Sequence, residues 1–143
     1  MGRPDPHSAD LLLARLAEPS SERVIEHLAD GLAKLGDPRA VAALFSLLAR
    51  DLDPFLRLDL AAALLSLRSP SGFSAIRVAL ESEDATVLID RQAAALLAHF
   101  RGDDLGLATA TPQSRPAVLA RLRGWLEERG EKLRWREERR RFE

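Results

Sequence analysis

Histidines and carboxylates are the residues of this chain that could bind a metal ion or catalyse acid–base chemistry. The histidines are His7, His27 and His99. A metal site would need such groups in a cluster, for example two histidines at helical spacing beside a carboxylate. The three histidines lie in separate segments, so we predict no metal site and expect them at the surface or at the edge of the core.

Nucleophilic catalysis requires a nucleophile, a base and a group that orients the base. Serines are frequent, but none stands in an elbow motif, and no glycine-rich phosphate loop is present. Asp37, Asp53 and Asp84 stand where helices are expected to begin, and capping of backbone N–H groups explains carboxylates at such positions. We therefore predict a protein that is not an enzyme, with no catalytic residues and no cofactor.

The composition is that of one helical domain. The chain has 143 residues, 46% of them hydrophobic, with leucine and alanine dominant. It has no cysteine, which excludes disulfides and thiolate metal ligands. The segment from Met1 to His7 is polar, unlike a signal peptide, and charges interrupt every long apolar stretch. We therefore expect a cytoplasmic protein that does not bind or cross a membrane.

Charge is unevenly distributed along the chain. The formal net charge is −1, which does not favour a polyanion-binding protein. Residues 1–113 carry 11 basic and 16 acidic side chains, whereas residues 114–143 carry 10 basic and 6 acidic ones. The last segment is thus basic, although the chain as a whole is not.

The stretch from Asp37 to Leu67 predicts two helices, each opened by an Asp-Pro pair. Aspartate suits the N-cap, and proline at the first helical position loses no hydrogen bond. Apolar residues then recur at the spacing of one helical face, at Val41, Leu44, Phe45, Leu47 and Leu48, and again at Leu56, Leu60, Leu64 and Leu67. Neither short helix can bury its apolar face alone, so each must pack against neighbouring helices.

Apolar positions repeat along the chain with a period of 16 residues. One series is Leu12, Leu28, Leu44, Leu60 and Ile76, and a parallel one is Leu16, Leu32, Leu48, Leu64 and Leu80. Alternate units are rich in alanine, so the full repeat is a helix pair of 32 residues. A fixed period of this size is typical of a solenoid, in which each pair contacts only its neighbours.

Residues 36–67 resemble the HEAT-like repeats first described in phycobilin lyases and widespread in bacterial proteins. The matching positions are Gly36-Asp37-Pro38, Ala40-Val41, Leu44, Asp51, Leu56-Arg57 and Ala61-Ala62-Ala63-Leu64. The resemblance covers about residues 5–102. It implies an all-α fold, a right-handed α-solenoid of about three HEAT-like helix pairs. As an alternative function, it implies a lyase-like or accessory enzyme of the HEAT-repeat type.

These patterns divide the chain into four parts. We expect residues 1–7 to be a flexible leader, residues 8–102 the HEAT-like repeat solenoid, and residues 103–114 a loop. Residues 115–143 are expected to form a C-terminal capping helix and a basic tail, because a solenoid needs a cap at each end. Both tryptophans, Trp125 and Trp135, lie in this last part.

The helix expected over residues 54–67 is apolar on nearly every side. The face of such a second helix lines the concave groove of a HEAT-like solenoid, and an exposed apolar patch there would mark a binding surface. We therefore predict a non-catalytic adaptor or scaffold that binds a peptide or helix of another protein in this groove. The predicted partner-binding residues are Phe55, Leu58, Ala62, Leu65, Arg23, Asp30 and Arg91.

Three alternatives remain open at this stage. The C-terminal tail could fold over the apolar face of residues 54–67, or the face could be the seam of a homodimer. Nucleic acid could instead bind the tail, where Arg139-Arg140-Arg141 lie near Trp135 and Phe142, because arginine neutralises phosphate and aromatic rings stack on bases. Glutamates interleaved with these arginines favour a solvated cap of mixed charge instead. They are Glu127, Glu128, Glu131, Glu137, Glu138 and Glu143.

Overall fold

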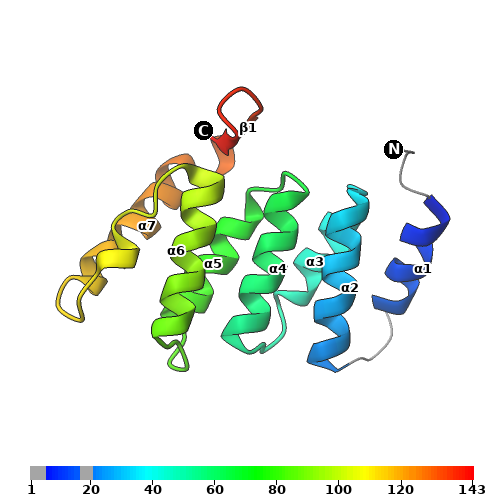
Figure 1. Ribbon diagram of the computed structural model, residues 1–143, viewed down its shortest axis with the longest axis horizontal. Helices are drawn as coiled ribbons and strands as arrows, with labels where there is room; N and C mark the ends of the chain where they lie inside the picture. The colour runs from blue at the N-terminus through cyan, green and yellow to red at the C-terminus, as the bar shows by residue number, and fades with distance from the viewer. Residues whose placement is uncertain (1–5, 17–20) are drawn as a thin grey trace.

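The computed structural model describes residues 6–16 and 21–143 of the chain (Figure 1). These residues form an all-α fold of seven α-helices with two short 3-10 turns and one small antiparallel hairpin. The helices are α1 (Pro6–Leu16), α2 (Glu22–Leu35), α3 (Ala40–Leu47), α4 (Pro54–Ser66), α5 (Ser71–Glu81), α6 (Val87–Arg101) and α7 (Arg115–Arg129). None of the helices in this described part is both long and apolar enough to cross a membrane.

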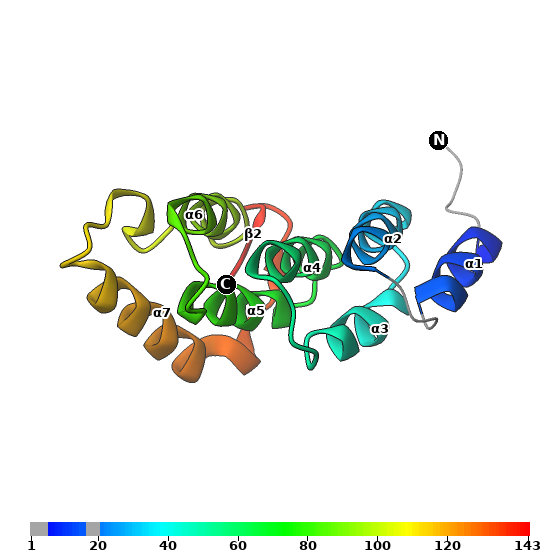
Figure 2. The same cartoon turned by 90° about the horizontal axis from the view of Figure 1, so that it is seen from below.

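The helices lie in two rows. Helices α2, α4 and α6 lie side by side in one row, and α3, α5 and α7 lie in the other (Figure 2). Helix α4 is the central element, because it packs against α2, α3, α5 and α6. Helix α1 packs against α2 and α3 at the N-terminal end of the molecule.

The helix start at Asp53-Pro54 was predicted correctly. The Asp53 side chain accepts a hydrogen bond from the backbone N–H of Phe55 at 2.8 Å, and Pro54 is the first helical residue. The capping predicted for Asp84 is wrong, because α6 begins at Val87 after Thr86. Asp84 instead lies in a turn after α5, where its backbone N–H donates a hydrogen bond to the Ser82 hydroxyl.

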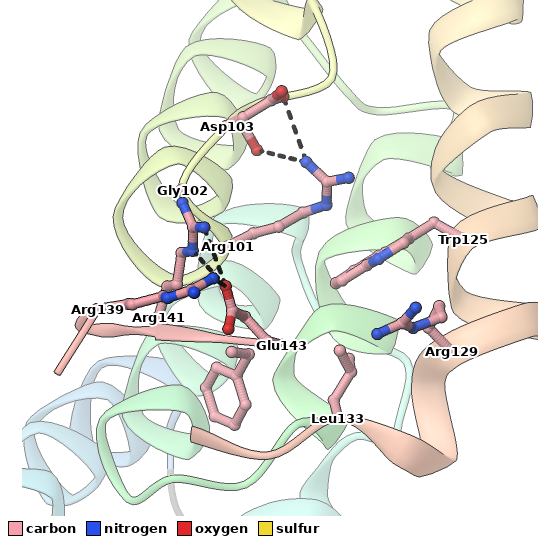
Figure 3. Close-up of a pocket in the computed structure, with 10 residues that line it drawn as sticks. Arg101, Gly102, Asp103, Trp125, Arg129, Leu133, Arg139, Arg141 and Glu143 are labelled. Carbon is pink, nitrogen blue, oxygen red and sulfur yellow. Dashed lines mark hydrogen bonds and ion pairs between the residues drawn. The ribbon is translucent and has the colours of Figure 1, made fainter. Parts of the chain in front are cut away.

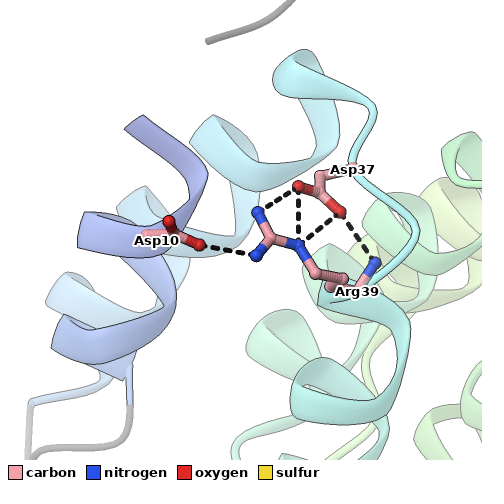
Figure 4. Close-up of polar contacts among 3 residues, drawn as sticks. All are labelled: Asp10, Asp37 and Arg39. Carbon is pink, nitrogen blue, oxygen red and sulfur yellow. Dashed lines mark hydrogen bonds and ion pairs between the residues drawn. The ribbon is translucent and has the colours of Figure 1, made fainter. Parts of the chain in front are cut away.

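Asp37 has a different role from the predicted helix cap, because α3 begins only at Ala40. Its carboxylate accepts hydrogen bonds from the backbone and side-chain N–H groups of Arg39, and this holds the pKa of Asp37 below its usual range. The same guanidinium reaches Asp10 of α1 at 2.6 Å (Figure 4). An exposed ion pair adds little stability. The network therefore serves mainly to orient α1 against the start of α3.

The core consists of two clusters of buried side chains, and α4 contributes to both. The N-terminal cluster takes Leu56, Leu60 and Leu64 from α4. The C-terminal cluster takes Leu58, Ala61 and Leu65 from the same helix. Helix α4 therefore buries two faces rather than one, because neighbours surround it on several sides.

The closest approach within the core is between α4 and α5 at Gly72. A Cβ atom at this position would lie 2.6 Å from the carbonyl oxygen of Ala61 and 2.6 Å from Cγ of Leu65. Such distances are far below van der Waals contact. Only glycine fits here, and its absent side chain lets α5 cover the Leu65 side of α4.

The end of the chain forms a hairpin that the sequence did not predict. Strand β1 (Trp135–Arg136) pairs antiparallel with β2 (Arg141–Phe142), with Trp135 opposite Phe142. The Phe142 ring meets the Phe73 ring of α5 edge-on, with centroids 5.4 Å apart. The hairpin thus joins the C-terminal cluster, while α7 begins at Arg115, where the capping helix was expected.

Candidate functional site

A cavity of about 330 Å³ lies between α2 and α4, on the row that also contains α6. We call it the α2–α4 groove. Its lining residues are Glu26, His27, Asp30, Ala33, Asp59, Ala62, Ala63 and Ser66. The volume is at the lower end of the range of small-molecule pockets, and it is large enough for one or two side chains of a partner.

Helical spacing brings these side chains together. Glu26, Asp30 and Ala33 are four and three residues apart on α2, and Asp59, Ala62 and Ser66 are three and four apart on α4. Side chains at such spacings lie on one face of a helix. Alanine at positions 33, 62 and 63 fills little of the space between the helices, which leaves the groove open.

Carboxylates dominate the charge of the α2–α4 groove. Within the described parts of the chain, Asp30 is the one groove carboxylate with an ion-pair partner, the Lys34 ammonium at 2.9 Å, and both groups are well exposed. Burial, together with the negative charges of Glu26, Asp30 and Asp53, raises the pKa of Asp59 to about 6. Among the described residues, the lining of the groove thus contains three carboxylates and no lysine or arginine.

The predicted partner-binding residues separate into two groups. Asp30 and Ala62 line the α2–α4 groove. Phe55 is 36% exposed at the start of α4, and Arg23 and Arg91 are exposed on α2 and α6 without lining the groove. These five residues are accessible, and their role in binding remains a prediction.

The exposure predicted for Leu58 and Leu65 is wrong. Leu58 is 2% exposed and Leu65 is fully buried, both in the C-terminal cluster. The physical reason is that α5 and α6 pack against this side of α4, with Gly72 of α5 in direct contact with Leu65. The two leucines therefore belong to the core and cannot contact a partner in the folded protein.

The accessible stripe of α4 runs through Phe55, Asp59, Ala62 and Ser66. The sequence carries a signal for this stripe, because Asp59 and Ser66 are among the few polar residues of an otherwise apolar helix. A carboxylate in such a helix must face solvent or a polar site. Asp59, rather than the leucines, therefore indicates the exposed side of α4.

The described residues hold no cluster of three His, Cys, Asp or Glu side chains that could bind a metal ion. His27 lines the α2–α4 groove, and the His99 ring meets the Phe100 ring edge-on with centroids 4.6 Å apart. The side chain of His7 lies outside the described ones. The geometry gives neither His27 nor His99 a place in a catalytic constellation.

Comparison with known proteins adds no relative. A scan against protein-family models finds no match, and searches of the curated proteins and of the solved structures find none either.

Proposed function

We propose that this protein is a non-catalytic scaffold that binds a basic segment of another protein in the α2–α4 groove. The observation that carries the proposal is the set of groove carboxylates, Glu26, Asp30 and Asp59, of which only Asp30 has a cationic partner within the described residues. A lysine or arginine of a partner would supply the missing charge, and charge complementarity of this kind favours specific association.

The apolar side chain next to the groove supports a helical partner. Phe55 lies one turn before Asp59 on the same face of α4, and it is partly exposed. A helix that carries basic and apolar residues on one face could place the apolar ones on Phe55 and the basic ones in the groove. Such a partner would contact both the Phe55 ring and the Asp59 carboxylate on the accessible side of α4.

The arrangement of helices supports a HEAT-like solenoid as the architecture behind this function. The 16-residue period places successive helices in alternate rows, with α2, α4 and α6 side by side (Figure 2). In a right-handed solenoid of HEAT-like pairs, one row of second helices forms the surface on which partners bind. The position of the α2–α4 groove on the row of α2, α4 and α6 supports this assignment.

The test is a titration with a designed amphipathic helical peptide that presents lysine and leucine on one face. Backbone amide NMR shifts locate the binding site, and we expect the largest shifts at Glu26, Asp30, Asp59 and Ala62. The double variant Asp30→Asn/Asp59→Asn should weaken binding by about tenfold or more, since each charge-assisted contact is worth about 1.5–3 kcal/mol.

The matched control is Glu127→Gln/Glu128→Gln, which removes the same charge from exposed positions of α7. This variant should bind the lysine peptide as the unmodified protein does. A peptide with glutamate in place of lysine should not bind. Equal binding of the two peptides, or equal loss of affinity in both double variants, would refute a groove specific for basic segments.

A further inference from the structure

A second cavity, of about 450 Å³, lies at the C-terminal end of the molecule and is rich in arginine (Figure 3). We call it the arginine pocket. The end of α6, helix α7 and the terminal hairpin meet around it. Its lining residues are Arg101, Gly102, Asp103, Trp125, Arg129, Leu133, Arg139, Arg141, Phe142 and Glu143.

Gly102 lets the hairpin close this pocket against the end of α6. Its φ of +95° turns the chain out of the helix in a conformation that favours glycine. A Cβ atom here would lie 2.8 Å from Cδ of Arg141 and 2.9 Å from one of its terminal nitrogens. A side chain at position 102 would therefore displace the Arg141 guanidinium from the pocket.

The pocket holds four guanidinium groups and only two carboxylates. Arg139 and Arg141 share one oxygen of Glu143, which each reaches at 2.9 Å. Arg101 pairs with Asp103 at 3.3 Å, whereas Arg129 has no ion-pair partner among the described residues. The lining side chains thus carry two positive charges in excess, and Arg129 is the lining guanidinium without a carboxylate partner in the described part of the chain.

Arg101 is held in place before any ligand arrives. Its side chain is 19% exposed, and its guanidinium carbon lies 4.7 Å from the centre of the Trp125 ring. The buried Nε–H has no hydrogen-bond partner within the described part of the chain. A donor group fixed in advance loses little conformational entropy when it binds an anion.

We propose that the arginine pocket binds a small molecule that carries a phosphate monoester. Guanidinium forks match the oxygen geometry of phosphate, and Arg129, Arg101 and Arg139 offer donors that Asp103 and Glu143 do not occupy. The pocket volume exceeds that of a bare phosphate and lies in the range of small-molecule sites. Trp125 provides an aromatic wall for the organic part of the ligand.

A nucleic-acid strand fits this surface less well than a single phosphate. Glu131, Glu137 and Glu138 are exposed and are interleaved in the sequence with the arginines of the last segment. An extended polyanion would lie across these carboxylates and be repelled by them. The pocket itself concentrates positive charge at one point, which matches one phosphate group.

The test is an NMR titration of the full chain at low salt with phosphoserine, serine, inorganic phosphate and a short oligothymidylate. Shifts of the arginine Nε–H signals report directly on the guanidinium groups. We expect phosphoserine to move the signals of Arg101 and Arg129, and serine to move neither. Inorganic phosphate that binds as tightly as phosphoserine would support a phosphate site that needs no organic part.

The variant Arg129→Gln should weaken phosphoserine binding about tenfold, because it removes the unpaired cation. The control is Arg121→Gln, which removes the same charge two turns earlier on α7 and outside the pocket. It should change the affinity by less than about twofold, an effect of long-range charge alone. Equal losses in the two variants would overturn the proposal, as would tighter binding of oligothymidylate than of phosphoserine.

Discussion

The N-terminal and C-terminal core clusters are built from different types of side chain. The N-terminal cluster, around α2, α3 and one side of α4, is built of leucine, isoleucine and alanine alone. The C-terminal cluster adds the rings of Phe73, Phe100 and Phe142, with Trp125 and Trp135 packed against it. The N-terminal cluster has no buried aromatic side chain, whereas the C-terminal cluster combines aliphatic side chains with buried rings.

This difference shows how α7 and the terminal hairpin cover the helices at the C-terminal side of the molecule. Within the row, the next helix pair buries each apolar face. After α6, helix α7 and the hairpin cover the C-terminal cluster with large rings. Arginines fix these covering elements in place. Arg115 binds both oxygens of Asp90 at 2.9 and 3.0 Å, and Arg68 lies 3.7 Å over the Trp135 ring.

The largest expected effect concerns α4, which joins the two clusters. Leu58→Asp would place an unpaired carboxylate in the C-terminal cluster, because Leu58 is 2% exposed. Burial of such a charge is costly, and we expect the free energy of unfolding to fall by about 4 kcal/mol or more. Urea denaturation followed by circular dichroism measures the loss.

Phe55→Asp is the matched control for Leu58→Asp. It introduces the same charge one turn earlier on α4, where the side chain is partly exposed. The free energy of unfolding should change by less than about 1 kcal/mol. If the Leu58→Asp and Phe55→Asp variants had the same free energy of unfolding, Leu58 would not be buried in the core.

A second prediction tests whether the aromatic closure is essential. Phe142→Ala removes a ring that contacts the rings of Phe73 and Trp135, each at 5.4 Å between centroids. We expect a loss of about 3 kcal/mol, within the range for a buried phenylalanine. Tryptophan fluorescence reports on the C-terminal region alone, because both tryptophans lie there, and circular dichroism reports on all helices.

Phe45→Ala is the control, because the Phe45 side chain is 56% exposed on α3. It should cost less than about 1 kcal/mol. Fluorescence and circular dichroism transitions that separate in Phe142→Ala would show that the two regions can unfold independently. A loss no greater than that of Phe45→Ala would mean that the hairpin contributes little to closure.

The smallest expected effect concerns the acidic groove of the N-terminal region. The pKa of Asp59 is raised to about 6 from an ordinary value of 3.8, so the folded state binds a proton that the unfolded state has already lost. Protonated Asp59 therefore contributes its full share to the free energy of unfolding below about pH 4, and this contribution is lost as the pH rises through 6. Asp59→Asn should restore about 1 kcal/mol at pH 7, after allowance for solvent screening.

The measurement is the difference in unfolding free energy between Asp59→Asn and the unmodified protein at several pH values. The difference should be near zero at about pH 4 and grow to its full value above pH 6. Asp84→Asn, at an exposed turn position, serves as the control. A difference that does not change with pH would show that Asp59 is an ordinary surface carboxylate.

Local sequence signals predicted much of the fold. The Asp53-Pro54 helix start and the start of α7 at Arg115 both follow from hydrogen bonds or backbone angles within a few residues. Apolar positions at the spacing of one helical face predicted short helices that must pack against neighbouring helices. These features could be predicted because the groups that determine them are close in the sequence.

Local sequence signals could not predict which side of α4 is exposed. An apolar helix pattern shows which residues can be buried, but the number of neighbouring helices decides how many of them are buried. Four neighbours cover α4, so Leu58 and Leu65 lie in the core, whereas Asp59 and Ala62 line the groove. Asp59 and Ser66, the polar residues of the stripe, were the local sign of which side of α4 is exposed.

The amino-acid sequence by itself determined the helical class, the helix-pair period and the basic character of the last segment, because these depend on residue types and on short-range spacing. The tertiary structure alone decided that Arg101, Arg129 and Arg141 meet in one pocket and that Phe142 packs on Phe73. The physical reason is distance along the chain. Residues that far apart share no local pattern, and only the packing of α5, α6 and α7 brings them together.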